Sequence, residues 1–454
     1  MAFHRPLLLA TALLAAATGA QAATVIRGAR VIDGTGAPPR DDVTLVVDGD
    51  HFSIVGPGLR VKMPDGTRVV DYTGKTIIPG LVSDHGHIGL VDGTKSGQPA
   101  LYNRDNALRQ LRQWRAYGVT TVTSLGLNNA DVFYPLRTDL HAGKAEGADL
   151  FGADHGIGVP NGAPPAKMMQ AGTNQLDRPA TPDEARAAVD AAAARGTDLI
   201  KVWVDDFNGS LPVKMKPEIW RAVIAEAHSK HLRVAAHIYY LADARQLVDD
   251  GVDILAHGVR DKPVDQGFID AMKQHGTWYI ATLDLNEAAF IYARHPAWMD
   301  QPFFAHAVQP ALATQFADGA WRDKVQNDGS TPVNEAALKT NEQNLKALYD
   351  AGVKIGFGTD AGATPLRIPG FAEHRELALM VDAGLTPLQS IQVATQRAAE
   401  LLGLEDRGVI ANGKRADFIV LDGDPSRDIE ATTHIRAVWQ RGVQVSGSVD
   451  TFTP

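Results

Sequence analysis

Short apolar runs alternate with longer amphipathic segments through the middle of the chain, from residue 76 to residue 404. The runs have the length of strands, and the segments between them repeat apolar residues at the helical period. The runs that predict strands are 76–82, 119–125, 150–153, 199–204, 233–236, 254–256, 278–282 and 354–357. The segments that predict helices are 106–117, 182–195, 217–230, 241–250, 268–275, 335–351 and 387–402.

Eight strands that alternate with helices predict an α/β fold in which residues 76–404 form a closed (β/α)8 barrel of the TIM type. In such a barrel the active site is assembled at the carboxyl ends of the strands. The alternative is an open, doubly wound sheet. No G-x-G-x-x-G follows the first strand, however, and polar residues end many of the strands, which favours the barrel.

The two chain ends, residues 23–75 and 405–454, show a different pattern of short alternating apolar stretches broken by Gly, Asp and Pro. This pattern is typical of small antiparallel strands. Because both ends share it, we predict that they pair into one small β-sandwich domain beside the barrel.

The connection between the last two predicted strands, residues 284–333, is too long and too aromatic for a simple turn. Its aromatic residues are Phe290, Tyr292, Trp298, Phe303, Phe304, Phe316 and Trp321. Over the mouth of a barrel, such an insertion forms a lid or an apolar substrate wall. A helical pair on the barrel flank, or a subunit contact, explains the same residues, and the sequence does not choose between these roles.

The N-terminus has the pattern of a secretory signal, because Arg5 precedes an apolar stretch that ends in Ala20-Gln21-Ala22. We predict that residues 1–22 are a signal peptide cleaved after Ala22, and that the protein is exported to the periplasm or secreted. A membrane anchor is the alternative, but the apolar part is short for a span and no second apolar stretch follows it.

The composition narrows the class of function. With 44% hydrophobic and 21% charged residues, the 454-residue chain has the make-up of a globular enzyme. A net charge of −9 without any basic run argues against a nucleic-acid partner. The absence of cysteine excludes disulfides and thiolate ligands, so a metal site must use His, carboxylates or modified Lys. We expect a small-molecule or dipeptide-like substrate and no membrane span, and we leave a homo-oligomer open.

The candidate chemistry begins with the motif PGLVSDHGH, in which His85 and His87 end the first predicted barrel strand. Residues two apart on a strand point to the same face, so both imidazoles can share one cation. Alone, H-x-H is weak evidence. Four more residues strengthen it, because each ends a separate apolar strand. These are Lys201, His237, His257 and Asp360.

Four histidines and a carboxylate suit zinc or another divalent first-row metal. Lys201 is unusual in this set, since a buried ammonium beside cations would be desolvated and repelled. Reaction of its neutral amine with carbon dioxide would give a carbamate, which can bridge two metals. The alternative is an ordinary lysine paired with Asp205 or Asp206.

With these residues in place, the sequence resembles the amidohydrolase superfamily of metal-dependent hydrolases, and within it the imidazolonepropionase-like and prolidase-type group. The likeness extends from VIRGARVIDGTG through PGLVSDHGH, DLIKV, AHGVRDKPVDQGFIDAMKQHG, GFGTDAG and RELALMVDAGLTPLQSI to GVIANGKRADFIVLDGDP. One departure is visible. Relatives usually have Asp two residues before the first His, where this chain has Ser83, followed by Asp84.

The resemblance implies a binuclear centre with two divalent ions, most simply zinc. One ion would be held by His85, His87 and Asp360, and carboxylated Lys201 would bridge it to the ion held by His237 and His257. A metal-bridging hydroxide would attack an amide carbonyl, with Asp360 as general base and then general acid.

Four further residues are candidates for substrate binding. Tyr239 lies in an H-x-Y motif that helps to hold the substrate carboxylate in prolidase-type relatives, although a rim tyrosine explains it equally well. Arg367 is a second candidate carboxylate partner, and His155 and His374 are candidates for the pocket lining.

A carboxylate clamp of this kind predicts a dipeptide or an N-acyl amino acid as substrate. Cyclic amides, lactones or xenobiotic amides and esters need the same metals without the clamp. A catalytically inactive metal-binding protein is the third reading, and a complete set of ligands and base argues against it.

Overall fold

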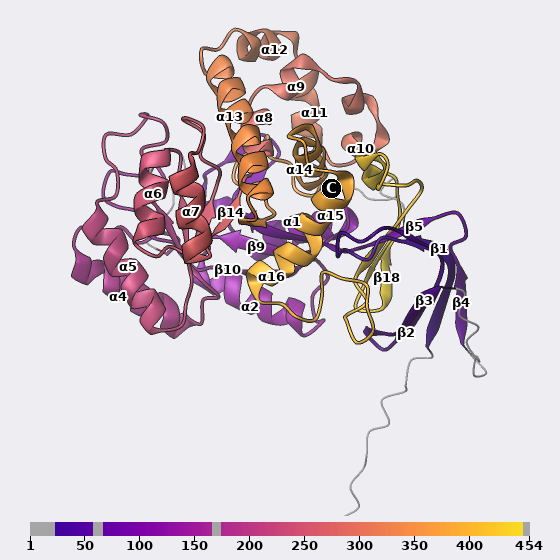
Figure 1. Ribbon diagram of the computed structural model, residues 1–454. Coiled ribbons are helices and arrows are strands. Elements are labelled where there is room, and N and C mark those ends of the chain that lie inside the picture. The colour runs from indigo at the N-terminus through magenta and orange to yellow at the C-terminus, as the bar shows by residue number, and fades with distance from the viewer. Residues whose placement is uncertain (1–22, 58–66, 166–173, 448–454) are drawn as a thin grey trace, which may run out of the picture.

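The computed structural model describes residues 23–57, 67–165 and 174–447. The predicted signal peptide, residues 1–22, lies outside these residues and stays a prediction. Within them the chain has an α/β fold with a mixed sheet built from both chain ends and two parallel sheets (Figure 1). No described helix combines the length and the apolar character that a membrane span requires.

The terminal sheet has eight strands and joins the two ends of the chain, as the sequence predicted. Its strands are β1 (Thr24–Val31), β2 (Arg40–Asp48), β3 (His51–Pro57), β4 (Arg68–Asp71), β5 (Thr76–Pro79), β16 (Phe418–Leu421), β17 (Ile435–Gln440) and β18 (Val443–Ser446). The ends meet where β5 pairs antiparallel with β16. The sheet has its own buried core, in which the rings of Phe418 and Trp439 stack with centroids 5.2 Å apart.

The parallel strands form a three-stranded sheet, ordered β10-β9-β6, and a five-stranded sheet, ordered β11-β12-β13-β14-β15. The strands are β6 (Leu81–Gly86), β9 (Val119–Leu125), β10 (Asp149–Ala153), β11 (Ile200–Trp203), β12 (Val234–His237), β13 (Ile254–Ala256), β14 (Trp278–Ile280) and β15 (Lys354–Gly356). Isolated parallel bridges link Ala153 with Leu199 and Gly86 with Ala361. Nearly every residue of these strands is buried, as expected for a parallel sheet that is covered on both faces.

The first predicted strand, residues 76–82, is wrong in one respect, because it is two strands. Residues 76–79 belong to the terminal sheet as β5, and the parallel strand β6 begins at Leu81. The break falls at Gly80, where an added Cβ would lie 2.5 Å from Thr120 Oγ1. Only a glycine fits this close approach. The chain passes from one sheet to the other at Gly80, and because the run is apolar on both sides, its hydrophobic pattern does not reveal the change.

Helices follow most of the parallel strands, and several begin and end with sequence-encoded caps. At α4, Thr181 and Glu184 form a capping box, and Gly196 ends the helix in the left-handed conformation. The helices outside residues 284–329 are η1 (Pro99–Leu101), α1 (Arg104–Ala116), α2 (Ala130–His141), α4 (Pro182–Arg195), α5 (Pro217–Ser229), α6 (Leu241–Asp249), α7 (Gln266–His275), α13 (Ser330–Asp350), α14 (Phe371–Asp382), α15 (Pro387–Gln392), η3 (Val393–Arg397), α16 (Ala398–Leu402) and η4 (Ile429–Thr433). A short hairpin pairs β7 (Val91–Asp92) with β8 (Lys95–Ser96).

The insertion is helical and gathers with α13 at the top of Figure 1. Its elements are α8 (Asp284–Glu287), α9 (Ile291–Arg294), η2 (Ala297–Asp300), α10 (Pro302–Ala305), α11 (Pro310–Ala317) and α12 (Gly319–Gln326). Its aromatic side chains pack together: Tyr292 stacks on Phe316 with centroids 4.7 Å apart, and Trp298 lies 5.1 Å from Phe371 of α14. Most of the predicted aromatic wall is therefore a packing cluster. The ends of the insertion nevertheless reach the site described next.

Candidate metal centre

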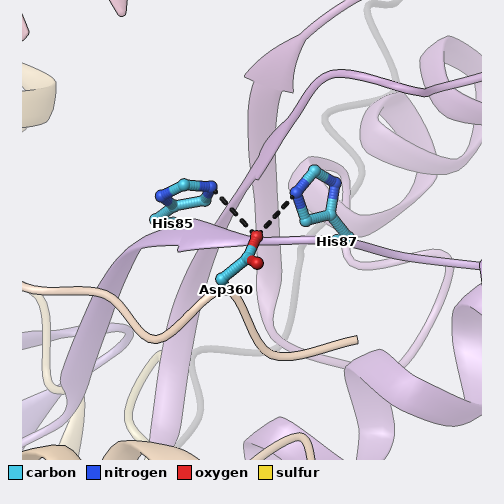
Figure 2. Close-up of side chains that lie close together, drawn as sticks. All are labelled: His85, His87 and Asp360. Carbon is cyan, nitrogen blue, oxygen red and sulfur yellow. Dashed lines mark ion pairs between the residues drawn. The ribbon is translucent and has the colours of Figure 1, made fainter. Parts of the chain in front are cut away.

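The centre is organised around β6 and the loop after β15. His85 lies in β6, and its carbonyl accepts the backbone N–H groups of Thr359 at 3.1 Å and Asp360 at 2.9 Å. Asp360 Oδ1 lies 3.2 Å from His85 Nε2 and 3.0 Å from His87 Nε2 (Figure 2). Ligand atoms of these three buried residues lie within 4.8 Å of one another, which is close enough for one cation to bind all three.

The backbone of Asp360 is in the left-handed region, with φ of 61°. For a residue other than glycine this conformation costs about 1–2 kcal/mol, and such strain concentrates at functional sites. The two hydrogen bonds to the His85 carbonyl hold the loop in this shape. As a result, the Asp360 carboxylate is placed between the two imidazoles.

His237 and His257 extend the cluster from His85. The ring centroids of His85 and His257 are 4.5 Å apart, and those of His257 and His237 are 4.4 Å apart. His257 Nδ1 lies 2.9 Å from Thr282 Oγ1, and His87 Nδ1 lies 3.2 Å from the Gly126 carbonyl. Contacts of this kind leave Nε2 of both rings available as a ligand atom.

Lys201 is buried in β11, and its Nζ has no hydrogen-bond partner among the described residues. Burial lowers the pKa of Lys201 to about 7, although Asp360 and Asp205 act in the opposite direction. The alternative prediction, a lysine paired with Asp205 or Asp206, is not what the structure shows. Instead, Oδ2 of Asp205 lies 3.4 Å from His237 Nε2.

The electrostatics of the cluster suit a divalent cation. Burial, followed by the charge of Lys201, lowers the pKa of His85 to about 3, and burial also lowers the pKa of His237 and His257. Burial alone would raise the pKa of Asp360, but Arg367 and the first two histidines hold it well below its usual range. Neutral imidazoles and an ionised carboxylate are the donors that a His/carboxylate metal site requires.

A cavity of about 340 Å³ opens onto this cluster. Five of the six predicted ligands line it, and Lys201 lies near enough to lower the pKa of three of the histidines. Leu285 and Asn286 from the insertion and Ser330, Val333, Asn334 and Ala337 from α13 also line it. The ends of the insertion therefore line the cavity, while its aromatic side chains pack against one another and against Phe371 of α14.

Two predicted substrate residues, Tyr239 and Arg367, line this cavity. The Arg367 guanidinium is already engaged, because Nη1 forms an ion pair with Asp360 Oδ2. Sequence analysis missed Arg260, which also lines the cavity. Its guanidinium lies 4.9 Å from the centroid of the Tyr239 ring, and its Nη2 donates to the Ile238 carbonyl at 2.9 Å.

Arg260 Nε is buried and has no hydrogen-bond partner among the described residues. No described carboxylate lies within ion-pair distance of this guanidinium, although Asp205 attracts it from further away. In the sequence, Arg260 lies in HGVR, three residues after the predicted ligand His257.

The other two predicted substrate residues do not line this cavity. The prediction for His374 is wrong: its Nε2 lies 2.9 Å from the Tyr117 carbonyl, and it faces a different cavity of about 460 Å³ beside Phe303. His155 lies beside Asp154 and Asp177, at 3.5 and 3.3 Å, and is not among the described residues that line the cavity at the metal cluster.

The departure at Ser83 has a structural counterpart in Glu373 of α14. Ser83 Oγ donates to Glu373 Oε1 at 3.2 Å, and the same oxygen accepts Trp114 Nε1 at 2.9 Å and Thr359 Oγ1 at 3.0 Å. Glu373 therefore connects β6 to the loop that carries Asp360. Sequence analysis missed this residue because the contact spans 290 positions.

Comparison with known proteins agrees with this arrangement. Residues 76–449 match the model described as "Amidohydrolase family". The imidazolonepropionase of Deinococcus radiodurans is 26% identical over 410 residues, which are 88% of this chain and 90% of that protein. The match to the imidazolonepropionase of Deinococcus deserti is 41% identical but spans only 104 residues, 22% of this chain and 26% of that protein.

Solved structures resemble the whole chain. The structure of a Xaa-Pro dipeptidase with bound methionine in the active site has a TM-score of 0.73 and 25% identity, and the match covers 94% of this chain and 100% of that one. Molinate hydrolase has a TM-score of 0.73 and 21% identity, over 94% of this chain and 95% of that one, which is a likeness in fold.

Proposed function

The chain belongs to the amidohydrolase family, as a metal-dependent hydrolase of carbon–nitrogen bonds, and we propose that it cleaves the amide bond of a dipeptide or an N-acyl amino acid. The observation that carries this proposal is that five of the six predicted ligands, which lie in or after four parallel strands, line one cavity that also holds Arg260, an arginine whose Nε has no hydrogen-bond partner among the described residues. The similarity to a Xaa-Pro dipeptidase supports the same class of substrate.

The residues present fit two divalent cations, which we propose to be zinc. His85, His87 and Asp360 would hold one of them, and His237 and His257 the other. When bound, such cations lower the pKa of a water molecule and polarise a carbonyl group. The proposed count of two ions rests on the family resemblance and on Lys201, which lies near enough to lower the pKa of His85, His237 and His257.

We propose that Lys201 is carboxylated in the loaded enzyme. Because its pKa is lowered to about 7, a large fraction of the amine is neutral near pH 7. The neutral nitrogen can form a bond with the carbon of carbon dioxide and release one proton, which leaves an anionic carbamate. This reaction replaces a buried unpaired amine with an acceptor that suits the surrounding ligand set.

Asp360 is suited to carry the proton. Its carboxylate is ionised, faces the cavity and is fixed by Arg367 on one oxygen and by two imidazoles on the other. It would accept the proton of the attacking water and return it to the departing amine, so no proton has to come from solvent.

Tyr239 and Arg260 would recognise the substrate carboxylate. A guanidinium that is buried without an ion-pair partner is costly unless an anion completes it, and arginine binds carboxylates through paired hydrogen bonds. Because Arg367 forms an ion pair with Asp360, we assign to Arg260 the carboxylate-binding role that the sequence suggested for Arg367.

For the fold, we propose that the two parallel sheets are halves of one closed eight-stranded barrel with a β-sandwich beside it. The Ala153–Leu199 and Gly86–Ala361 bridges support closure, because each connects an edge of one sheet to the neighbourhood of an edge of the other. Export through the predicted signal peptide is proposed on the sequence alone.

A substrate panel tests the proposed function. The purified protein is assayed with zinc, manganese or cobalt on dipeptides, N-acyl amino acids, their carboxamide-capped counterparts and lactones. We expect hydrolysis of the substrates with a free carboxylate, loss of activity with a chelator and recovery with metal. Activity confined to lactones would reject the carboxylate clamp, and a protein without activity or bound metal would reject the whole proposal.

A further inference from the structure

The loop after β11 places a second carboxylate against the metal cluster. Asp205 is fully buried, and its Oδ2 lies 3.4 Å from His237 Nε2. Apart from this contact, the oxygen has no polar partner among the described residues. Its other oxygen, Oδ1, accepts the backbone N–H of Phe207 at 2.7 Å. One side chain therefore contacts both a predicted ligand and the backbone of its own loop.

The same loop covers the face of the His237 ring. Phe207 and Asn208 have positive φ angles of 51° and 55°, which turn the chain sharply after Asp205. The turn carries the Phe207 ring to 4.8 Å from the His237 ring, centroid to centroid. Asp205 thus fixes the imidazole in two ways, directly at its Nε2 edge and indirectly through the ring packed on its face.

From this geometry we propose that Asp205 is a positioning residue that accepts the Nε2–H of His237 and so presents the unprotonated Nδ1 to a metal ion. The inference rests on the proposed function and extends it to a residue that no ligand motif contains. A carboxylate behind a ligating imidazole fixes the tautomer and raises the basicity of the ligand nitrogen. His87 and His257 have neutral partners, a carbonyl and a hydroxyl, so Asp205 gives His237 a stronger orienting contact.

Asp206 is a matched control on the same loop. Its Oδ1 accepts the Tyr240 hydroxyl at 2.9 Å and the Gly209 N–H at 2.8 Å, and no described contact joins it to a ligand histidine. Asp206→Asn and Asp205→Asn each remove one negative charge from neighbouring positions. Only the second change replaces the acceptor at His237 Nε2 with an amide.

The test measures zinc affinity by competition with a chromophoric chelator, zinc content at a fixed free concentration, and the absorption spectrum of the cobalt-loaded protein. For Asp205→Asn we expect about 10–100-fold weaker binding of the more weakly held ion, with an altered cobalt spectrum. Asp206→Asn should match the wild type in all three readouts. If Asp205→Asn does not fold, Asp205→Ser replaces it, because a serine hydroxyl can still accept the Phe207 N–H.

Two results overturn the inference. Zinc affinities of the Asp205 variants that equal the wild type would show that His237 needs no carboxylate. Equally weakened zinc binding in Asp206→Asn would show that the lost negative charge, and not the orientation of His237, lowers the affinity. A wild-type protein that binds no zinc would overturn the proposed function together with this inference. If the wild type binds zinc and hydrolyses its substrate, either of the two results above overturns only the role of Asp205.

Discussion

Replacing Asp360 with asparagine tests the assigned proton carrier most directly. The change is isosteric, but the neutral amide has one acceptor oxygen where the carboxylate has two. If the amide nitrogen faces the cluster, it meets Nε2 of His85 and His87. If it faces outward, it meets the Arg367 guanidinium. Every ligand except Asp360 remains, so most of the metal-binding set is retained.

The expected loss can be sized from general principles. Positioned acid–base groups contribute about 10²–10⁴-fold to rate, which corresponds to about 3–5 kcal/mol of transition-state stabilisation. We therefore expect kcat of Asp360→Asn to fall by about that factor. The partly buried ion pair with Arg367 is also lost. Breaking a fully buried pair costs about 3–5 kcal/mol of stability, so we expect a smaller loss here and a lower melting temperature.

The assay compares kcat at saturating zinc with the zinc content measured by elemental analysis. Asp84→Asn is the control. Asp84 is buried as well, its Oδ2 accepts the Phe357 N–H at 3.0 Å, and burial raises the pKa of its carboxyl well above the usual value, which favours the uncharged form. This control should stay close to the wild type. A near-normal kcat in Asp360→Asn, with metal bound, would refute the role of Asp360 as the proton carrier.

Two other predictions concern recognition and pH. Arg260→Met should raise KM for substrates with a free carboxylate by about 10–100-fold, because a hydrogen bond to a charged group contributes about 1.5–3 kcal/mol. The KM for carboxamide-capped substrates should not change. Equal losses for both kinds of substrate in steady-state kinetics would contradict the carboxylate clamp. Burial raises the pKa of Glu376 to about 8, while its carboxyl accepts the backbone N–H groups of Leu283 and Asp284. A raised folded-state pKa stabilises the protein at low pH, and this contribution is lost as pH rises through about 8, so the melting temperature of Glu376→Gln should improve relative to wild type between pH 6 and pH 9. A constant difference across that range would show that Glu376 does not titrate there.

Much of the parallel core could be predicted because buried parallel strands appear as continuous apolar runs. Strands β9 and β13 have the predicted bounds, and the other predicted barrel strands after the first differ only at their ends. For the same reason, the polar residues that end these runs could be predicted to meet at one site. In a barrel, an ionisable side chain directly after a buried parallel strand lies at the carboxyl end of that strand, where the active site is assembled.

Elements without a one-sided pattern were harder to predict. Helix α14 was missed because nine of its twelve residues are buried, so it lacks the polar face that marks an amphipathic helix. Helix α2 was missed as well, and Pro135 within it weakens the helical signal. Arg260 and Glu373 depend on contacts between distant segments, which no local spacing reveals.

The pairing of β5 with β16 has a consequence for how the molecule is assembled. Thr76 pairs with Leu421, so the hydrogen bonds between β5 and β16 can form only after the intervening chain has folded back and brought the two strands together. Contacts of such long sequence separation form slowly during folding. Until the last strands arrive, β5 presents an unsatisfied edge of backbone donors and acceptors, and edges of this kind invite association with other chains. The final tenth of the polypeptide therefore covers the exposed edge of β5. Its loss should promote aggregation before it affects the predicted metal ligands.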